Sequence, residues 1–137
     1  GTLYGDMAGG LGVLGDCYKL QVYELANYIN SSKIIIPKNI IEKAPSAELR
    51  PDQKDSDSLP PYAILDKILY LYIEERKGWK EIVAMKEEGL DEALVRKIIR
   101  MVDHNEYKRF QASPTLRISH KAFGFGRSMP IVARYNH

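Results

Sequence analysis

Hydrophobic residues recur at helical spacing in four stretches of the chain. In the first, Asp16 is placed as an N-cap ahead of an apolar stripe. The second covers residues 62–74. The third is shorter, covers residues 79–86 and is expected to end at Gly89, and Asp91 is the expected N-cap of the fourth. The stripes are Leu20, Tyr23, Ala26 and Ile29; Ile64, Leu65, Ile68, Leu69 and Tyr72; Trp79, Ile82 and Val83; and Leu94, Val95, Ile98, Ile99 and Val102. They predict a mostly α-helical chain whose core they form, and we assign them no chemistry.

Two segments between these stripes lack helical spacing. Residues 34–36 are three isoleucines followed by Pro37, which predicts an extended segment or a short strand, although the proline argues against a central strand. Residues 43–61 contain four prolines and many charges but no apolar period. We expect a long loop there, which is a candidate lid loop, with a mobile surface connection as the alternative.

A glycine-rich loop precedes the first stripe. Glycines at this density permit positive φ and a close approach of the backbone to a ligand; they are Gly5, Gly9, Gly10, Gly12 and Gly15. A capping box would place Glu or Gln at position 19, where the chain has Lys19. A cation opposes the helix dipole there, unless Lys19 and the helix amides together hold an anion such as phosphate. The alternative is a solvated lysine on a surface helix.

Composition narrows the class of protein. The chain has 137 residues, a net charge of +2 and 45% hydrophobic residues, enough for one domain with a core. No apolar run approaches a membrane span, and no signal-peptide pattern opens the sequence. The single cysteine, Cys17, excludes an internal disulfide and suits a reducing cytoplasm. We therefore expect a cytoplasmic protein without a membrane partner.

The charge balance changes after Glu106, the last acidic residue of the chain. Basic and aromatic side chains alternate from there on: Lys108, Arg109, Phe110, Arg117, Lys121, Phe123, Phe125, Arg127, Arg134 and Tyr135. Such a tail is a candidate surface for nucleic acid, a nucleotide or an acidic neighbour, with an ordinary solvated tail as the alternative. The three histidines lack metal-ligand spacing, and the sequence contains no catalytic triad, Walker loop or dinucleotide fingerprint. We assign no catalytic residue and no metal ligand.

Several blocks, taken in order, resemble the synthetase domain of the NAD synthetase family, in its glutamine-dependent branch. They are LYGDMAGGLGVLGDCYKLQVYELA, IIEKAPSAEL, QKDSDSLPPY, the pair Leu65-Asp66, NEYKRFQASP and KAFGFGRSMPI. Each block alone is weakly specific, whereas the ordered set is specific and covers nearly all of residues 1–137. This resemblance implies the C-terminal half of an α/β adenine-nucleotide-hydrolase-like domain of the ATP pyrophosphatase type, which in this fragment would be mostly α.

The resemblance also implies roles for five residues. By position in the motifs, Lys19 and Ser46 would bind ATP. Lys108 would bind deamido-NAD, with Tyr4 and Asp6 lining the same side. Relatives in the ammonia-dependent branch carry a lysine where Leu3 stands, so no role is transferred to that position. Tyr107 receives only a weak one, because those relatives carry a His-Lys pair at positions 107 and 108.

The implied reaction is the ATP-dependent amidation of deamido-NAD to NAD, through an acyl-adenylate that ammonia attacks. Ammonia would come from glutamine through a glutaminase domain of the same polypeptide, and the family leads us to expect a homo-oligomer. The family's Ser-Gly-Gly-x-Asp-Ser phosphate loop and its magnesium ligand are absent from the sequence, so Mg²⁺ would be held elsewhere and the chain alone should be inactive. The competing interpretation is a small helical module whose basic aromatic tail binds nucleic acid, but it leaves the glycine loop and Lys19 unexplained.

Overall fold

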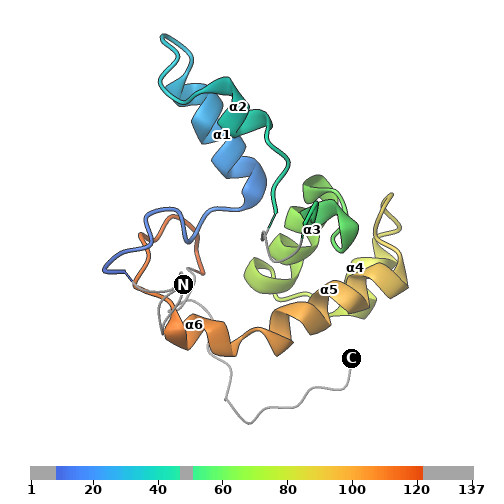
Figure 1. The fold of residues 1–137 in the computed structure, drawn as a ribbon. Coiled ribbons are helices and arrows are strands. Elements are labelled where there is room, and N and C mark those ends of the chain that lie inside the picture. Colours follow the sequence, from blue (N-terminus) through green and yellow to red (C-terminus); the bar gives the residue numbers. More distant parts are fainter. Residues whose placement is uncertain (1–8, 47–50, 122–137) are drawn as a thin grey trace. The chain divides into compact units, whose positions relative to one another are not determined.

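The computed structural model describes residues 9–46 and 51–121, whose regular structure is helical (Figure 1). The elements are α1 (Lys19–Ile29), α2 (Lys38–Glu42), the 3₁₀ helix η2 (Asp55–Asp57), α3 (Tyr62–Leu69), the π-helix η3 (Tyr70–Glu74), α4 (Trp79–Ala84), α5 (Glu92–His104) and α6 (Tyr107–Gln111). Within these residues the expected mostly α structure is confirmed, and the one β-type pairing is an isolated parallel bridge between Gly12 and Thr115. None of the described helices is long and apolar enough to cross a membrane.

The chain divides into two compact units, and each is described by itself. The first, which we call the α1–α2 unit, is Tyr18–Asp66. The second, the α4–α5 unit, combines the segment that ends at Cys17 with the segment that begins at Lys67. The boundary therefore falls within α3.

The best-buried side chains lie in the α4–α5 unit. There α5 packs against α4, and α4 packs against η3. Ile68, Ile82 and Val95 are fully buried, and Ile98 and Ile99 are 1% exposed. All five belong to the stripes found in the sequence, so the predicted core positions of these helices are confirmed.

Two predicted helix boundaries have different outcomes in this unit. Asp91 is the N-cap of α5, and its Oδ1 accepts a hydrogen bond of 3.0 Å from the Leu94 amide, as predicted. The end of α4 comes at Ala84 and not at Gly89, because Lys86 already leaves the helix with a φ of +53°. Gly89, at φ +82°, instead shapes the turn that leads into α5.

The prediction that Asp16 caps α1 is wrong. The helix begins at Lys19 with Tyr18 as N-cap, and Gln21 Oε1 accepts a 2.9 Å hydrogen bond from the Tyr18 amide. The Asp16 carboxylate instead accepts hydrogen bonds from both the amide and the hydroxyl of Ser119, at 2.7 and 3.0 Å. It also accepts one of 2.7 Å from the Ile118 amide, so this side chain joins the two chain segments of the α4–α5 unit.

Gly12 and Gly15 bring the glycine-rich loop against this same C-terminal segment. The Gly12 amide donates a 2.8 Å hydrogen bond to the Pro114 carbonyl. A Cβ at Gly15 would lie 2.3 Å from Thr115 Cγ2, so no larger residue fits without a shift. At Gly15 the close approach expected for a ligand is therefore made to another part of the chain.

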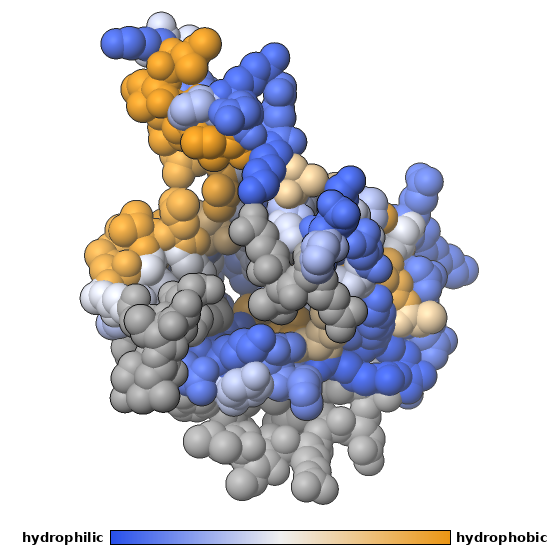
Figure 2. Space-filling view, in the orientation of Figure 1, coloured by the Kyte–Doolittle hydropathy of each residue, from blue (hydrophilic) through white to orange (hydrophobic). Residues whose placement is uncertain are grey.

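The α1–α2 unit exposes much of its apolar surface. The prediction that the stripe of α1 forms core is wrong, because no residue of α1 is buried; Figure 2 shows hydrophobic surface over α1 and the segment that follows it. Ile34 and Ile35 are 73% and 66% exposed. The predicted short strand is not formed here, because Asn30 Oδ1 accepts hydrogen bonds from the amides of Ile35 and Ile36 and ties this segment back to the end of α1.

Candidate functional site

Lys19 is the first residue of α1, and two side-chain acceptors hold the backbone on either side of it. Gln21 binds the Tyr18 amide, as described above. From α3, the Asp66 carboxylate is 9% exposed, and its Oδ2 accepts a 2.9 Å hydrogen bond from the Leu20 amide. Asp66 thus places a negative charge at the N-terminus of α1, which offsets the unfavourable effect of Lys19 on the helix dipole.

This arrangement corrects one part of the sequence interpretation. We expected the amides of the first helical turn to join Lys19 in holding an anion. The Leu20 amide, however, already donates to the Asp66 carboxylate within the protein. Anion binding at this place would therefore depend on side-chain cations more than on the helix terminus.

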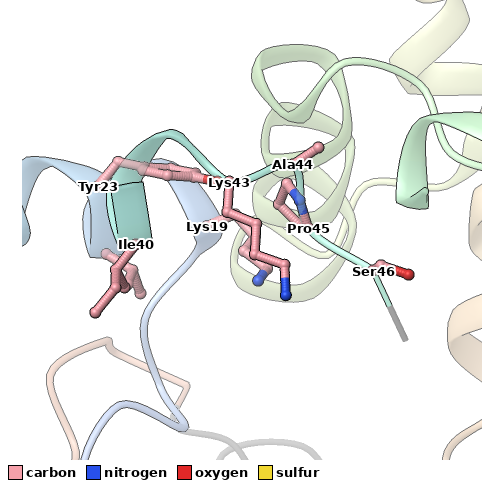
Figure 3. Close-up of a pocket in the computed structure, with 8 residues that line it drawn as sticks. Lys19, Tyr23, Ile40, Lys43, Ala44, Pro45 and Ser46 are labelled. Carbon is pink, nitrogen blue, oxygen red and sulfur yellow. The ribbon is translucent and has the colours of Figure 1, made fainter. Parts of the chain in front are cut away.

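Lys19 and Ser46, predicted from separate sequence blocks, line the same open pocket of about 320 Å³ (Figure 3). This volume lies at the lower end of the range for ligand pockets, roughly 300–1,000 Å³. The rest of the lining comes from α1, α2 and the start of the 43–61 loop: Val22, Tyr23, Ile40, Lys43, Ala44 and Pro45. In this view the Ser46 hydroxyl points away from the lysine ammonium groups. All of these residues belong to the α1–α2 unit.

Tyr62 positions the Lys19 side chain. The Lys19 ammonium lies 5.8 Å from the centroid of the Tyr62 ring, within the range of a cation–π interaction. The Tyr62 hydroxyl donates a 2.7 Å hydrogen bond to Asp55 Oδ2 in η2. Burial raises the pKa of the Tyr62 phenol, and the hydrogen bond to Asp55 raises it further. The phenol therefore stays protonated at neutral pH and keeps donating to Asp55.

Asp55 also connects the two described parts of the 43–61 loop. Its amide donates a 2.9 Å hydrogen bond to the Pro45 carbonyl, next to Ser46. Asp55 of η2 is thus hydrogen-bonded both to Pro45, which lines the pocket, and to Tyr62. Within the α1–α2 unit, sequence reasoning assigned roles to Lys19 and Ser46 only. It missed Tyr62 and Asp66, although the PPY and Leu-Asp blocks that contain them were visible.

The other predicted ligand residue, Lys108, lies in α6 of the α4–α5 unit. Its neighbour Arg109 forms a 2.9 Å ion pair with Glu106, and both side chains of this pair are about one-tenth exposed. Lys108 is exposed, with its ammonium 6.0 Å from the Tyr107 ring centroid. Of the two consecutive cations, Lys108 is therefore the one presented to solvent.

Much of the positive charge in the described part of the tail is engaged by the protein itself. Arg117 donates to the carbonyls of Ser119 and His120, at 3.0 and 2.6 Å. Lys121 donates a 2.8 Å hydrogen bond to the Glu74 carbonyl at the end of η3. Burial lowers the pKa of Lys121, as does the charge of Arg76. These bonds give Arg117 and Lys121 structural roles and weaken the interpretation of the tail as a nucleic-acid surface.

Two predictions cannot be placed, and no metal ligand set emerges. Tyr4 and Asp6 lie outside the described residues. Among residues 9–46 and 51–121, no group of three or more His, Cys, Asp or Glu side chains is placed to hold a metal ion.

Comparison with known proteins gives consistent matches. The family model for NAD synthase matches residues 1–112. The glutamine-dependent NAD(+) synthetase of Acinetobacter baylyi is 56% identical over 133 residues, 96% of this chain and 24% of that protein. The enzyme of the same name from Thermotoga maritima is 49% identical over 98% of this chain and 23% of its own length. This chain thus spans about a quarter of these relatives.

A solved structure gives the same result. It is described as glutamine-dependent NAD+ synthetase from Acinetobacter baumannii in complex with adenosine diphosphate. The match has a TM-score of 0.51 and 46% sequence identity, and it covers 96% of this chain and 22% of that one. Sequence and structure comparisons therefore point to one protein family.

Proposed function

Because this chain belongs to the NAD synthase family, we propose that it forms part of an ATP-dependent amide ligase that converts deamido-NAD to NAD. The observation that carries this proposal is that Lys19 and Ser46 line one pocket in the α1–α2 unit. The A. baumannii relative was solved with an adenine nucleotide, which supports ATP as the ligand. The nucleic-acid module considered as the alternative finds no support in these comparisons.

The proposed reaction has two steps. A carboxylate oxygen of deamido-NAD attacks the α-phosphorus of ATP, the bond to the β-phosphate breaks, and pyrophosphate leaves. Ammonia then attacks the acyl carbon of the adenylate, its nitrogen loses a proton to solvent, and AMP leaves with the electron pair of the cleaved bond. In this proposal Lys19 holds the phosphates as negative charge develops on the leaving pyrophosphate, and its position is fixed before the reaction begins.

Other features of the proposal come from the family. We expect the adenine-nucleotide-hydrolase-like fold, a glutaminase domain in the same polypeptide that supplies ammonia, a homo-oligomer and a cytoplasmic location. When Mg²⁺ is bound, it would neutralise charge on the phosphates, and its ligands are expected outside this chain. Tyr4 and Asp6 stay predictions for the deamido-NAD side.

Lys108 is proposed to bind deamido-NAD. It is exposed on α6, while the Glu106–Arg109 ion pair anchors the helix beside it. In the complete enzyme, Lys108→Ala should raise the KM for deamido-NAD roughly tenfold, since a hydrogen bond to a charged group is lost, with a smaller change for ATP. Steady-state kinetics with each substrate varied in turn measures both constants. Equal, small effects on the two would remove the assignment.

Residues 43–61 are proposed to be a lid loop. Lys43 and Ser46 at its start line the pocket, and the bond from Asp55 to Pro45 connects its two described parts. Closure over the adenylate would keep water from a hydrolysable intermediate. Hydrogen exchange across residues 44–58 of the complete enzyme should slow when ATP and deamido-NAD are both bound. Unchanged exchange would make the segment a linker only.

A further inference from the structure

One tyrosine, Tyr62, contacts Lys19 and is also joined to the segment that carries Ser46. It is the first residue of α3 and is half-buried. Its ring lies 5.8 Å from the Lys19 ammonium, and its hydroxyl donates a 2.7 Å hydrogen bond to Asp55 Oδ2. The Asp55 amide donates a 2.9 Å hydrogen bond to the Pro45 carbonyl, which belongs to the peptide unit that leads into Ser46. Tyr62 is therefore connected to both residues that the sequence assigns to ATP.

The face of α3 that carries Tyr62 also holds the backbone at the start of α1. Asp66 follows Tyr62 by one helical turn, so the two side chains lie on one face of α3. Asp66 Oδ2 accepts the 2.9 Å hydrogen bond from the Leu20 amide, while Tyr62 contacts the side chain of the preceding residue, Lys19. A free lysine side chain samples many rotamers, and a contact at its tip reduces that freedom. Both the backbone and the side chain are thus restrained before any ligand binds.

An aromatic partner suits a lysine that binds phosphate. A carboxylate in the same place would neutralise the ammonium and occupy its N–H groups. The face of an aromatic ring attracts the ammonium through its quadrupole and leaves the positive charge in place. Tyrosine also offers a hydroxyl, and here the Asp55 carboxylate accepts its hydrogen bond and restrains the ring. Tyr62 can therefore orient Lys19 without competing with an anion for its charge.

We propose that Tyr62 is a positioning residue of the ATP site, which holds Lys19 through its ring and the segment of Ser46 through its hydroxyl and Asp55. The inference rests on the proposed function, because Lys19 and Ser46 line the pocket that we assign to ATP. Adenylation requires the phosphates to be aligned with the attacking carboxylate, and a small misplacement of the binding groups lowers the rate steeply. Tyr62 touches no reacting atom and acts only through the residues that it holds.

The test uses the complete enzyme and measures kcat/KM for ATP from pyrophosphate release at saturating deamido-NAD. Tyr62→Phe keeps the ring and removes the hydrogen bond to Asp55, so kcat/KM should fall roughly tenfold. Tyr62→Leu also removes the cation–π contact and should cost about threefold more. Asp55→Ala should match Tyr62→Phe, whereas Asp55→Asn keeps an acceptor oxygen and should recover most of the loss. The matched control is Tyr28→Phe on α1, because Tyr28 is 76% exposed and does not line the pocket.

Repeating these measurements with Lys19→Met separates positioning from a purely structural role. If the ring acts through Lys19, the additional cost of Tyr62→Leu over Tyr62→Phe should disappear once Lys19 is replaced. The same threefold cost in both backgrounds would overturn the proposal, because the ring would then act independently of the lysine. Tyr62 variants that behave as Tyr28→Phe, while Lys19→Met lowers kcat/KM, would also overturn it and leave the phosphate site standing.

Failure of the proposed function would give a different result. If Lys19→Met and every Tyr62 variant keep the wild-type kcat/KM for ATP, the phosphate site itself is wrong and the role of Tyr62 falls with it. Thermal midpoints show whether each variant is folded. If Tyr62→Leu does not fold, Tyr62→Phe combined with Asp55→Ala decides the question, since the pair should lose no more than either single variant. Losses that multiply in the pair would contradict a shared hydrogen bond.

Discussion

Replacing Lys19 by methionine in the complete enzyme should slow adenylation about a hundredfold, a loss on the order of 3 kcal/mol in transition-state stabilisation. The reason is that pyrophosphate gains negative charge as it leaves, and Lys19 is already in place to stabilise that charge. The Asp66 carboxylate fixes the start of α1, and the Tyr62 ring lies under the ammonium at 5.8 Å. Methionine keeps the length and helix propensity of the side chain and removes only its charge.

The measurement is the rate of pyrophosphate release with saturating ATP and deamido-NAD. The thermal midpoint of the variant reports whether the part that carries Lys19 is folded, and glutamine hydrolysis, followed separately, reports on the glutaminase domain. Lys38→Met serves as the charge-matched control on the neighbouring helix. Wild-type adenylation in the Lys19 variant would make this residue the solvated surface lysine of the alternative interpretation.

Gly15→Ala should destabilise the α4–α5 unit by about 1–3 kcal/mol, the range for overpacking a tight contact. The new methyl group would lie 2.3 Å from Thr115 Cγ2. Thr115 cannot move aside easily, because its side chain is β-branched and the preceding Pro114 carbonyl is bound to the Gly12 amide. The thermal midpoint of the complete enzyme should fall accordingly.

Two further variants test the cause of this destabilisation. Gly10→Ala is the matched control, since a Cβ there would meet nothing within 4 Å and the thermal midpoint should stay unchanged. Adding Thr115→Ser to Gly15→Ala removes the clashing methyl group and should restore most of the lost stability. A midpoint that is equally low in the double variant would show that the glycine is needed for another reason.

The helices were predictable because their signal is local. Ile82 follows Trp79 by three positions, as Ile98 follows Val95, and Ile82, Val95 and Ile98 form part of the core of the α4–α5 unit. The cap at Asp91 was also readable, since its partner Leu94 lies three residues away. The start of α1 was not predictable in this way. Gln21 accepts the hydrogen bond from the Tyr18 amide, and Asp16, the expected cap, binds Ser119 far along the chain.

Long-range contacts account for most of what the sequence could not reveal. Asp16 and Ser119 are 103 positions apart, and Asp66 lies 46 positions from Leu20. No periodic pattern connects such pairs. The candidate site shows the same division, because Lys19 and Ser46 were recognisable from motifs, whereas the bond from Asp66 to the start of α1 appeared only in the fold.

The most direct measurement is a structure of the complete enzyme with a non-hydrolysable ATP analogue bound. We expect phosphate oxygens within hydrogen-bond distance, about 2.7–3.2 Å, of the Lys19 ammonium at the N-terminus of α1. The analogue would then occupy the pocket lined by Lys19 and Ser46. Phosphates bound elsewhere, with the Lys19 ammonium surrounded by solvent, would contradict the account.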